Sequence, residues 1–319
     1  MSSFFRWLKK INHRHRRLII IVFIIWGFWF FGFGALLSFF LSKGQLARFP
    51  DLTNHDRILI LAPHVDDEVI SSAGIINHAL KTGAAIKIVY LTNGDNSLSA
   101  VIKENRNLKL SPNEFVSLGE QRMSEAKAAT AVLGLTADNL IFLGYPDQGL
   151  TPMFNKYYDP SNPYASKGTE FTYNPYSGTY KSGQLYTGTN VVNDLNEIIQ
   201  SFNPTVIIAP HPRDIHPDHH AAYLFLEKVL NENSLRPQIF TYLVHYPRFP
   251  VDKKLASNQF LYPPKKLYTQ EGWYSYDLSP DQITIKLEAV KQNVSQKEFG
   301  RVYDLLQSFV KKNEIFEKM

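Results

Sequence analysis

Two clusters of histidine and aspartate hold the residues of this sequence best suited to chemistry. The first is PHVDDE at 63–68, and the second is HPRDIHPDHH at 211–220, which contains four of the ten histidines of the chain. A helix-capping aspartate beside an unrelated histidine would explain only one carboxylate of the first cluster. Solvent-exposed loop histidines are the alternative for the second. Two such clusters in one chain favour a metal site instead.

The types and spacing of these residues fit a single divalent metal ion. His64 and Asp67 are three residues apart and can converge on one cation, whereas Asp66 projects differently and can address a water. His216 and His219 lie near the start of the next predicted helix. Two histidines and one carboxylate, with open positions for water, form the arrangement of hydrolytic zinc enzymes. Iron and cobalt suit the same ligand types.

Hydrolysis also needs a base for the water proton and a donor for the developing oxyanion and the leaving amine. Asp66 is placed for the first task, and His216 is placed for the second. A carboxylate such as Asp218 or Asp214 would hold the His216 ring in one tautomer. The two clusters therefore predict a metal-assisted hydrolase.

Alternating strand and helix patterns must position these clusters. Short apolar runs rich in β-branched residues predict buried parallel strands at 57–62, 86–92, 139–143 and 205–209. Apolar residues at three- and four-residue spacing predict helices at 68–81, 114–133, 191–201 and 219–231. A further strand is expected at 238–246, and 279–312 is expected to be mostly helical. The alternation predicts an α/β fold with a doubly wound, Rossmann-like parallel sheet and helices on both faces. Both clusters directly follow strands, at the edge where such sheets bind ligands.

Residues 151–188 interrupt this alternation. The segment is dense in Tyr, Pro, Gly, Ser and Asn and has little periodicity. We expect either a surface excursion or a lid whose tyrosines stack on sugar rings, because structureless loops of this length are uncommon without a role.

The N-terminal residues predict a membrane anchor. Residues 18–42 contain no charged residue and are long enough to cross a hydrocarbon core of roughly 30 Å. The run exceeds the apolar part of a typical signal peptide, and no small-residue cleavage site follows it. Six basic residues precede it, namely Arg6, Lys9, Lys10, Arg14, Arg16 and Arg17. The positive-inside rule therefore places the tail, 1–17, in the cytoplasm and the larger domain outside the cell.

Charge and cysteine content exclude other classes of protein. The basic tail accounts for the net charge of +5, because 28 basic and 29 acidic residues follow it. The globular part gives no indication of nucleic-acid binding. The chain contains no cysteine, which excludes disulfides and thiolate sites. We expect a short linker at 43–56 and one catalytic domain at 57–319.

The motifs resemble those of the PIG-L/LmbE-like deacetylases, zinc enzymes that remove acetyl from N-acetylglucosamine groups. PHVDDE at 63–68 and HPDH at 216–219 carry the resemblance. It extends in order and spacing over 122–134, 142–150 and 203–222, and 241–250 and 295–298 resemble the longer bacterial members. The family usually has Pro where this chain has Val65, a residue that shapes the turn and ligates nothing.

The resemblance implies a role for each matching residue. It implies that the zinc ligands are His64, Asp67 and His219. It also implies that Asp66 is the general base, that His216 stabilises the oxyanion and that Asp218 orients His216. Family members use an arginine or aspartate near the sugar hydroxyls, for which the candidates are Arg122 and Asp147. A helical salt bridge with Glu125 is the alternative for Arg122.

The resulting hypothesis is a membrane-anchored bacterial deacetylase of N-acetylglucosamine-type sugars in a cell-surface glycan or glycolipid. The alternative is a carbohydrate-binding membrane protein without catalysis, in which we would expect a ligand or the base to be lost. A metallophosphoesterase would need a second metal and more ligands than these motifs supply.

Overall fold

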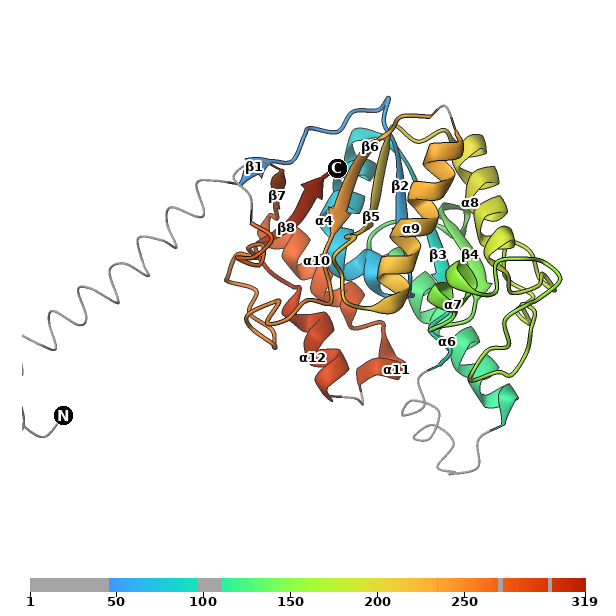
Figure 1. Ribbon diagram of the computed structural model, residues 1–319. Coiled ribbons are helices and arrows are strands. Elements are labelled where there is room, and N and C mark those ends of the chain that lie inside the picture. Colours follow the sequence, from blue (N-terminus) through green and yellow to red (C-terminus); the bar gives the residue numbers. More distant parts are fainter. Residues whose placement is uncertain (1–45, 97–110, 234, 269–271, 298–299) are drawn as a thin grey trace, which may run out of the picture. The chain divides into compact units, whose positions relative to one another are not determined.

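The computed structural model describes residues 46–96, 111–233, 235–268, 272–297 and 300–319 (Figure 1). Nearly all of the described residues belong to one compact unit, Ala47–Met319. The predicted tail and membrane span, 1–42, lie outside the described residues. Within the described part of the chain, no helix combines the length and apolar character needed to cross a membrane.

This unit is built on one mixed sheet. Its strands are β1 (Ala47–Arg48), β2 (Arg57–Ala62), β3 (Ala85–Thr92), β4 (Leu140–Tyr145), β5 (Val206–Pro210), β6 (Gln238–Tyr242), β7 (Trp273–Asp277) and β8 (Asn313–Lys318). They lie in the order β1-β7-β8-β6-β5-β2-β3-β4. All neighbouring pairs are parallel except those of β8, which runs antiparallel to β6 and β7. The fully parallel sheet predicted from the sequence is therefore corrected to a mostly parallel one.

Helices cover both faces of this sheet (Figure 1). They are α4 (Asp67–Thr82), α6 (Pro112–Val132), α7 (Leu150–Asn155), α8 (Gly188–Phe202), α9 (Pro217–Glu232), α10 (Pro280–Val290), α11 (Val294–Lys297) and α12 (Gly300–Ser308), with a short 3-10 helix at Ala137–Asn139. Helix α10 packs against α4 and α6, whereas α9 packs against α7 and α8. The α/β fold expected from the periodicity is confirmed, with bounds shifted by up to four residues, the largest shift being at the end of β6.

Alternate residues of the central strands form the main hydrophobic core. Leu59 and Leu61 of β2 and Val89 and Leu91 of β3 join apolar residues of α8 and α9 in one buried cluster. Successive side chains of a strand point to opposite faces of a sheet, so the intervening residues face the other helix layer. Burial on both faces explains why these strands are continuous apolar runs.

The strand order places the two motifs side by side. From β2 the chain proceeds outward through β3 and β4, then returns to build β5 and β6 on the other side of β2. The point where the order reverses, between β2 and β5, is where doubly wound sheets bind ligands at the carboxyl ends of their strands. Residues 63–68 follow β2, and residues 211–220 follow β5.

The folded unit begins earlier than the sequence predicts. Ala47 and Arg48 pair with β7, and Phe49 and Leu52 are buried. Part of the predicted linker, 43–56, therefore belongs to the domain. Strands β7 and β8 were not predicted, and the helical region expected at 279–312 is three helices.

Part of the insertion at 151–188 packs into the domain, and the rest is half-buried or exposed. Tyr164, Tyr176 and Tyr186 are buried, and the Tyr176 hydroxyl donates to Asp95 Oδ2 at 2.7 Å. These three tyrosines therefore support the protein core and are not free to stack on a sugar. The exposed Tyr173 stacks on Phe171 with ring centroids 5.2 Å apart. Sugar stacking by exposed aromatic residues of the insertion stays a prediction.

Candidate metal and catalytic site

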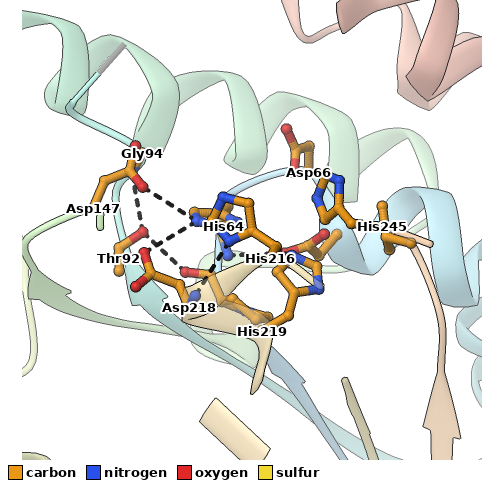
Figure 2. A network of polar contacts seen from close by, with 12 residues as sticks. His64, Asp66, Thr92, Gly94, Asp147, His216, Asp218, His219 and His245 are labelled. Carbon is orange, nitrogen blue, oxygen red and sulfur yellow. Dashed lines mark hydrogen bonds and ion pairs between the residues drawn. The ribbon is translucent and has the colours of Figure 1, made fainter. Parts of the chain in front are cut away.

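The three predicted metal ligands converge on one carboxylate oxygen. Asp67 Oδ2 lies 3.4 Å from His64 Nδ1 and 3.3 Å from His219 Nε2. It also accepts a hydrogen bond from the backbone N–H of His64 at 2.9 Å, which fixes the orientation of the carboxylate. All three side chains are buried. Figure 2 shows the two imidazoles close together beside the strand ends.

These distances fit a shared metal ion. Ligand atoms that each lie 2.0–2.2 Å from a tetrahedral ion are about 3.3–3.6 Å apart. Neither ring nitrogen of His219 has a hydrogen-bond partner of good geometry among the described residues, although the ring is fully buried. A buried imidazole without a partner is costly, and a metal ion on Nε2 would satisfy it. The donor set of two nitrogens and one oxygen suits zinc.

A second carboxylate faces His219 from behind. Asp214 Oδ2 lies 3.2 Å from His219 Nδ1. The same carboxylate accepts hydrogen bonds from the backbone N–H groups of His216, Val244 and His245. Burial raises the pKa of Asp214, but His219 and these hydrogen bonds outweigh it and lower the pKa to about 2. An ionised carboxylate behind a histidine fixes the tautomer and the ring orientation of a metal ligand.

Two carboxylates lie behind the ring of His64, as that of Asp214 lies behind His219. His64 Nε2 lies 3.3 Å from Asp147 Oδ1 and 3.5 Å from Asp218 Oδ2 (Figure 2). Asp218 also accepts from the backbone N–H groups of Gln148 and Leu150. The sequence predicted that Asp218 orients His216. In the structure the Asp218 carboxylate contacts His64, whereas its backbone N–H donates to His216 Nδ1 at 3.3 Å, so the role of Asp218 in orienting His216 stays a prediction.

Other groupings of possible ligand atoms overlap with this set. Within the described residues, one ligand atom from each of His64, His216 and His219 lies within 4.8 Å of the others, as does one from each of His64, Asp147 and Asp218. In the second grouping, His64 Nε2 lies 3.3 Å from Asp147 Oδ1 and 3.5 Å from Asp218 Oδ2, which is as close as the contacts of Asp67. Asp67 Oδ2 contacts both His64 and His219, and these three residues match the family motifs, so we take them as the candidate ligands.

Asp66, the predicted base, is held by two donors. Its Oδ2 accepts from Arg122 Nη2 at 3.0 Å and from Gln296 Nε2 at 2.5 Å. Burial raises the pKa of Asp66, and the positive charge of Arg122 opposes that rise. Arg122 also donates to the carbonyl oxygen of Gly94, so the predicted salt bridge with Glu125 is not the contact that it makes.

His216 is neutral and offers one donor. Its Nδ1 accepts from the backbone N–H of Asp218 at 3.3 Å, which leaves the ring proton on Nε2. Burial and the neighbouring rings of His64, His219 and His245 lower its pKa to about 3. The ring packs edge-on against His64, with centroids 4.8 Å apart. A neutral imidazole with its proton on Nε2 can donate a hydrogen bond to an oxyanion.

Sequence reasoning missed several residues that shape the site. Gln296 belongs to a segment that the resemblance included, but no role followed from it. Asp95 accepts from the backbone N–H of Asp147 at 3.0 Å and was not singled out. His245 lies 4.8 Å, centroid to centroid, from His219. His245 and Gln296 lie in segments that resemble the family, 241–250 and 295–298, but local sequence does not specify the tertiary packing that brings all three residues to the site.

The fold and the site define an α/β protein with a metal-ligand cluster at the switch point of its sheet. Residues 59–230, more than half of the chain, match the family model described as GlcNAc-PI de-N-acetylase, PIG-L. The chain therefore belongs to the PIG-L family. The matched region contains all three candidate ligands and Asp66.

Individual relatives are more distant. The chain is 36% identical over 90 residues to 1D-myo-inositol 2-acetamido-2-deoxy-alpha-D-glucopyranoside deacetylases from two strains of Mycobacterium sp., KMS and JLS. This match spans 28% of this chain and 28% of each relative.

Two solved structures resemble the chain. N,N'-diacetylchitobiose deacetylase from Pyrococcus horikoshii is 18% identical, with a TM-score of 0.49 over 83% of this chain and 84% of the other. The 4-carboxy-2-hydroxymuconate hydratase from Pseudomonas putida is 15% identical, with a TM-score of 0.47 over 77% and 82%.

Proposed function

We propose that this protein is a metal-dependent hydrolase that removes the N-acetyl group from N-acetylglucosamine-type sugars. The observation that carries the proposal is the position of Asp67 Oδ2, 3.4 Å from His64 Nδ1 and 3.3 Å from His219 Nε2, directly beside the buried carboxyl group of Asp66. Membership of the PIG-L family and the names of the mycobacterial relatives support the reaction and the class of sugar.

His64, Asp67 and His219 would hold the metal ion. Zinc suits this donor set best, and iron or cobalt would suit it as well. When bound, such an ion supplies Lewis-acid polarisation of a carbonyl oxygen and acidifies water. Asp214 behind His219, and Asp147 and Asp218 behind His64, hold the two rings in orientation.

The side chains of the site divide the proton transfers between them. Asp66 accepts a proton from the attacking water as general base. His216 donates from Nε2 to the oxygen of the acetamide as negative charge develops there. The amine needs a proton to leave, and the carboxyl group of Asp66, once protonated, can return one.

We propose a surface glycan or glycolipid as the substrate. The support is the sequence of the N-terminus, where the basic tail and residues 18–42 predict a single-pass anchor with the catalytic domain outside the cell. Contact of Arg122 and Asp147 with sugar hydroxyls stays a prediction. In the structure, Arg122 contacts Asp66 and Gly94, and Asp147 contacts His64.

The test is acetate release from N-acetylglucosamine oligosaccharides by the full-length protein in detergent. We expect release that a chelator abolishes and added zinc restores. Asp66→Ala should lower the rate by about 100- to 10,000-fold, the usual range for a general base. Asp138→Ala, which changes an exposed aspartate, should leave the rate unchanged.

The alternative hypothesis, a carbohydrate-binding protein without catalysis, predicts a different result. Such a protein would bind the oligosaccharide without releasing acetate, whether or not metal is present. Release that is equal in Asp66→Ala and in the unaltered protein would contradict the proposed role of Asp66.

A further inference from the structure

Gln296 reaches the candidate base from outside the region matched by the family model. Helix α11 carries it, 230 residues along the chain from Asp66. Its Nε2 and Arg122 Nη2 donate to the same oxygen, Asp66 Oδ2, at 2.5 Å and 3.0 Å. Gln296, Asp66 and Arg122 are 6%, 8% and 9% exposed, so water competes little for these hydrogen bonds.

Two donors on one oxygen constrain the whole carboxylate. A carboxylate oxygen has two lone pairs, and the two donors occupy both of those on Oδ2. Rotation of the side chain would break both hydrogen bonds. The other oxygen, Oδ1, is then the one left to accept a proton. The amide of Gln296 adds no charge, so it orients the carboxylate without adding a second cation beside it.

Helix α6 organises both donors. It carries Arg122 and, one turn later, Glu125. Glu125 accepts from the backbone N–H and the hydroxyl of Ser295, at 2.8 Å and 2.7 Å. Ser295 directly precedes Gln296, so Glu125 fixes the start of α11 where the amide can reach Asp66. Sequence alone suggested a salt bridge between Arg122 and Glu125. In the structure Arg122 contacts Asp66, and Glu125 contacts Ser295.

We propose that Gln296 is a positioning residue, which holds the carboxylate of Asp66 so that Oδ1 accepts the proton during deacetylation. The proposal rests on the function proposed above. It assigns a role in the reaction to the C-terminal region, which lies beyond the matched residues 59–230.

The first experiment compares the kinetics of variants in the metal-loaded, full-length protein. Gln296→Ala should lower kcat by about 10- to 100-fold, as expected for the loss of a hydrogen bond to a charged group, with KM and metal content unchanged. Gln296→Met keeps about the same size but loses the donor without adding a charge, so it should be at least as slow. The matched control is Gln292→Ala, because the Gln292 amide donates only to the backbone oxygen of Glu288 among its described contacts.

Two kinetic outcomes would overturn the proposal. One is a kcat for Gln296→Ala within twofold of that of the unaltered protein. The other is a Gln296→Met variant that is as active as the unaltered protein, because a side chain that acts only by filling space would tolerate this change.

A second experiment does not depend on turnover. Chemical unfolding of the unaltered protein, Gln296→Ala, Asp66→Ala and the double variant forms a double-mutant cycle. If the two side chains are in direct contact, Gln296→Ala should change the unfolding equilibrium constant at least threefold less in the Asp66→Ala variant than in the unaltered protein. Additive effects would show that the two residues do not interact. Non-additive effects in a protein that releases no acetate would refute the proposed function but support the contact between Gln296 and Asp66. Acetate release that Gln296→Ala does not change would support the proposed function but refute the role of Gln296.

Discussion

Carboxylates lie behind both candidate histidine ligands. His219 has Asp67 on one side and Asp214 on the other, at 3.3 Å and 3.2 Å. His64 has Asp67 on one side and Asp147 with Asp218 on the other. Burial lowers the pKa of both imidazoles, but the two carboxylates around His219 and the three around His64 outweigh it and raise the pKa, and they are more negative charge than a purely structural histidine needs. The arrangement suits rings that share a positive ion with Asp67.

Replacing Asp214 tests this interpretation at a single residue. Asp214→Asn removes the charge behind His219, and we expect metal affinity to fall by about 10- to 100-fold because such outer partners tune ligand basicity. Competition with a chelator of known affinity measures the change. Asp194→Asn is the control, because Asp194 is equally buried but bonds to Tyr145 and Gln184. Equal metal affinity in both variants would contradict the role of Asp214.

Asp95 makes the stability of the fold depend on pH. Burial, followed by the charge of Asp147, raises the pKa of Asp95 to about 7, compared with about 3.9 in an unfolded chain. Between these values the folded protein binds more protons than the unfolded chain, so this carboxyl group contributes stability below pH 4 that is lost as the pH rises to 7. One proton accounts for up to about 1.4 kcal/mol per pH unit.

Asp95→Asn should therefore flatten the dependence of stability on pH. The amide keeps the shape of the side chain, and its oxygen can still accept from the backbone N–H of Asp147. Urea unfolding at several pH values between 4 and 7 measures the slope for both proteins. Parallel slopes would show that Asp95 ionises in the folded protein as it does in the unfolded chain.

At the level of elements, side chains of strand β8 and helix α10 form hydrogen bonds to backbone groups in the middle of α4. In a regular helix the N–H of Gly74 bonds to the carbonyl oxygen of Ile70. Here the Gly74 N–H donates to Glu314 Oε1 at 2.9 Å, and Lys286 Nζ donates to the Ile70 oxygen at 2.8 Å. Lys286 and Glu314 also bond to each other at 2.8 Å. A Cβ at position 74 would lie 2.1 Å from Leu278 Cδ2 and 2.9 Å from Tyr276 Cε1, so any larger residue would require these side chains to move.

Breaking this buried pair should destabilise the protein. Lys286→Met leaves Glu314 charged and buried, which typically costs about 3–5 kcal/mol of unfolding free energy. Lys291→Met in the exposed pair with Glu288 should have a much smaller effect, because solvent screens exposed ion pairs. Denaturant unfolding of both variants gives the comparison. Similar small losses would mean that the buried pair contributes no more than the exposed one.

The elements differ in how well the sequence predicts them. Strands β2 to β5 and helices α4, α6, α8 and α9 carry their own apolar periodicity, so local sequence is enough. Strand β8 reads NEIFEK, in which Glu314 is buried only because Lys286 pairs with it. The same limit applies to the site. The residue types of 63–68 and 211–220 indicate a metal, but a partner such as Gln296 is set by tertiary packing alone.

The molecule combines two regions that contribute different parts of one site. The matched family region supplies the candidate ligands, Asp66 and His216. The chain after residue 230 adds β6, β7, β8 and three helices, which complete one edge of the sheet and bring Gln296 to Asp66. Tight packing of these elements against α4 and α6 ties the geometry of the base to the integrity of the C-terminal region. Truncations before β8 would therefore remove support from the site as well as from the fold.

The membrane topology of the whole molecule can be tested directly. The charge distribution around 18–42 predicts a cytoplasmic N-terminus and an external catalytic domain. In bacterial cells with a permeable outer layer or none, added protease should degrade a C-terminal tag and spare an N-terminal one. A cytoplasmic marker protein should stay intact until lysis. Protection of the catalytic domain until the cells are lysed would place it in the cytoplasm, and an intracellular N-acetylated sugar would then replace the surface glycan as the substrate to seek.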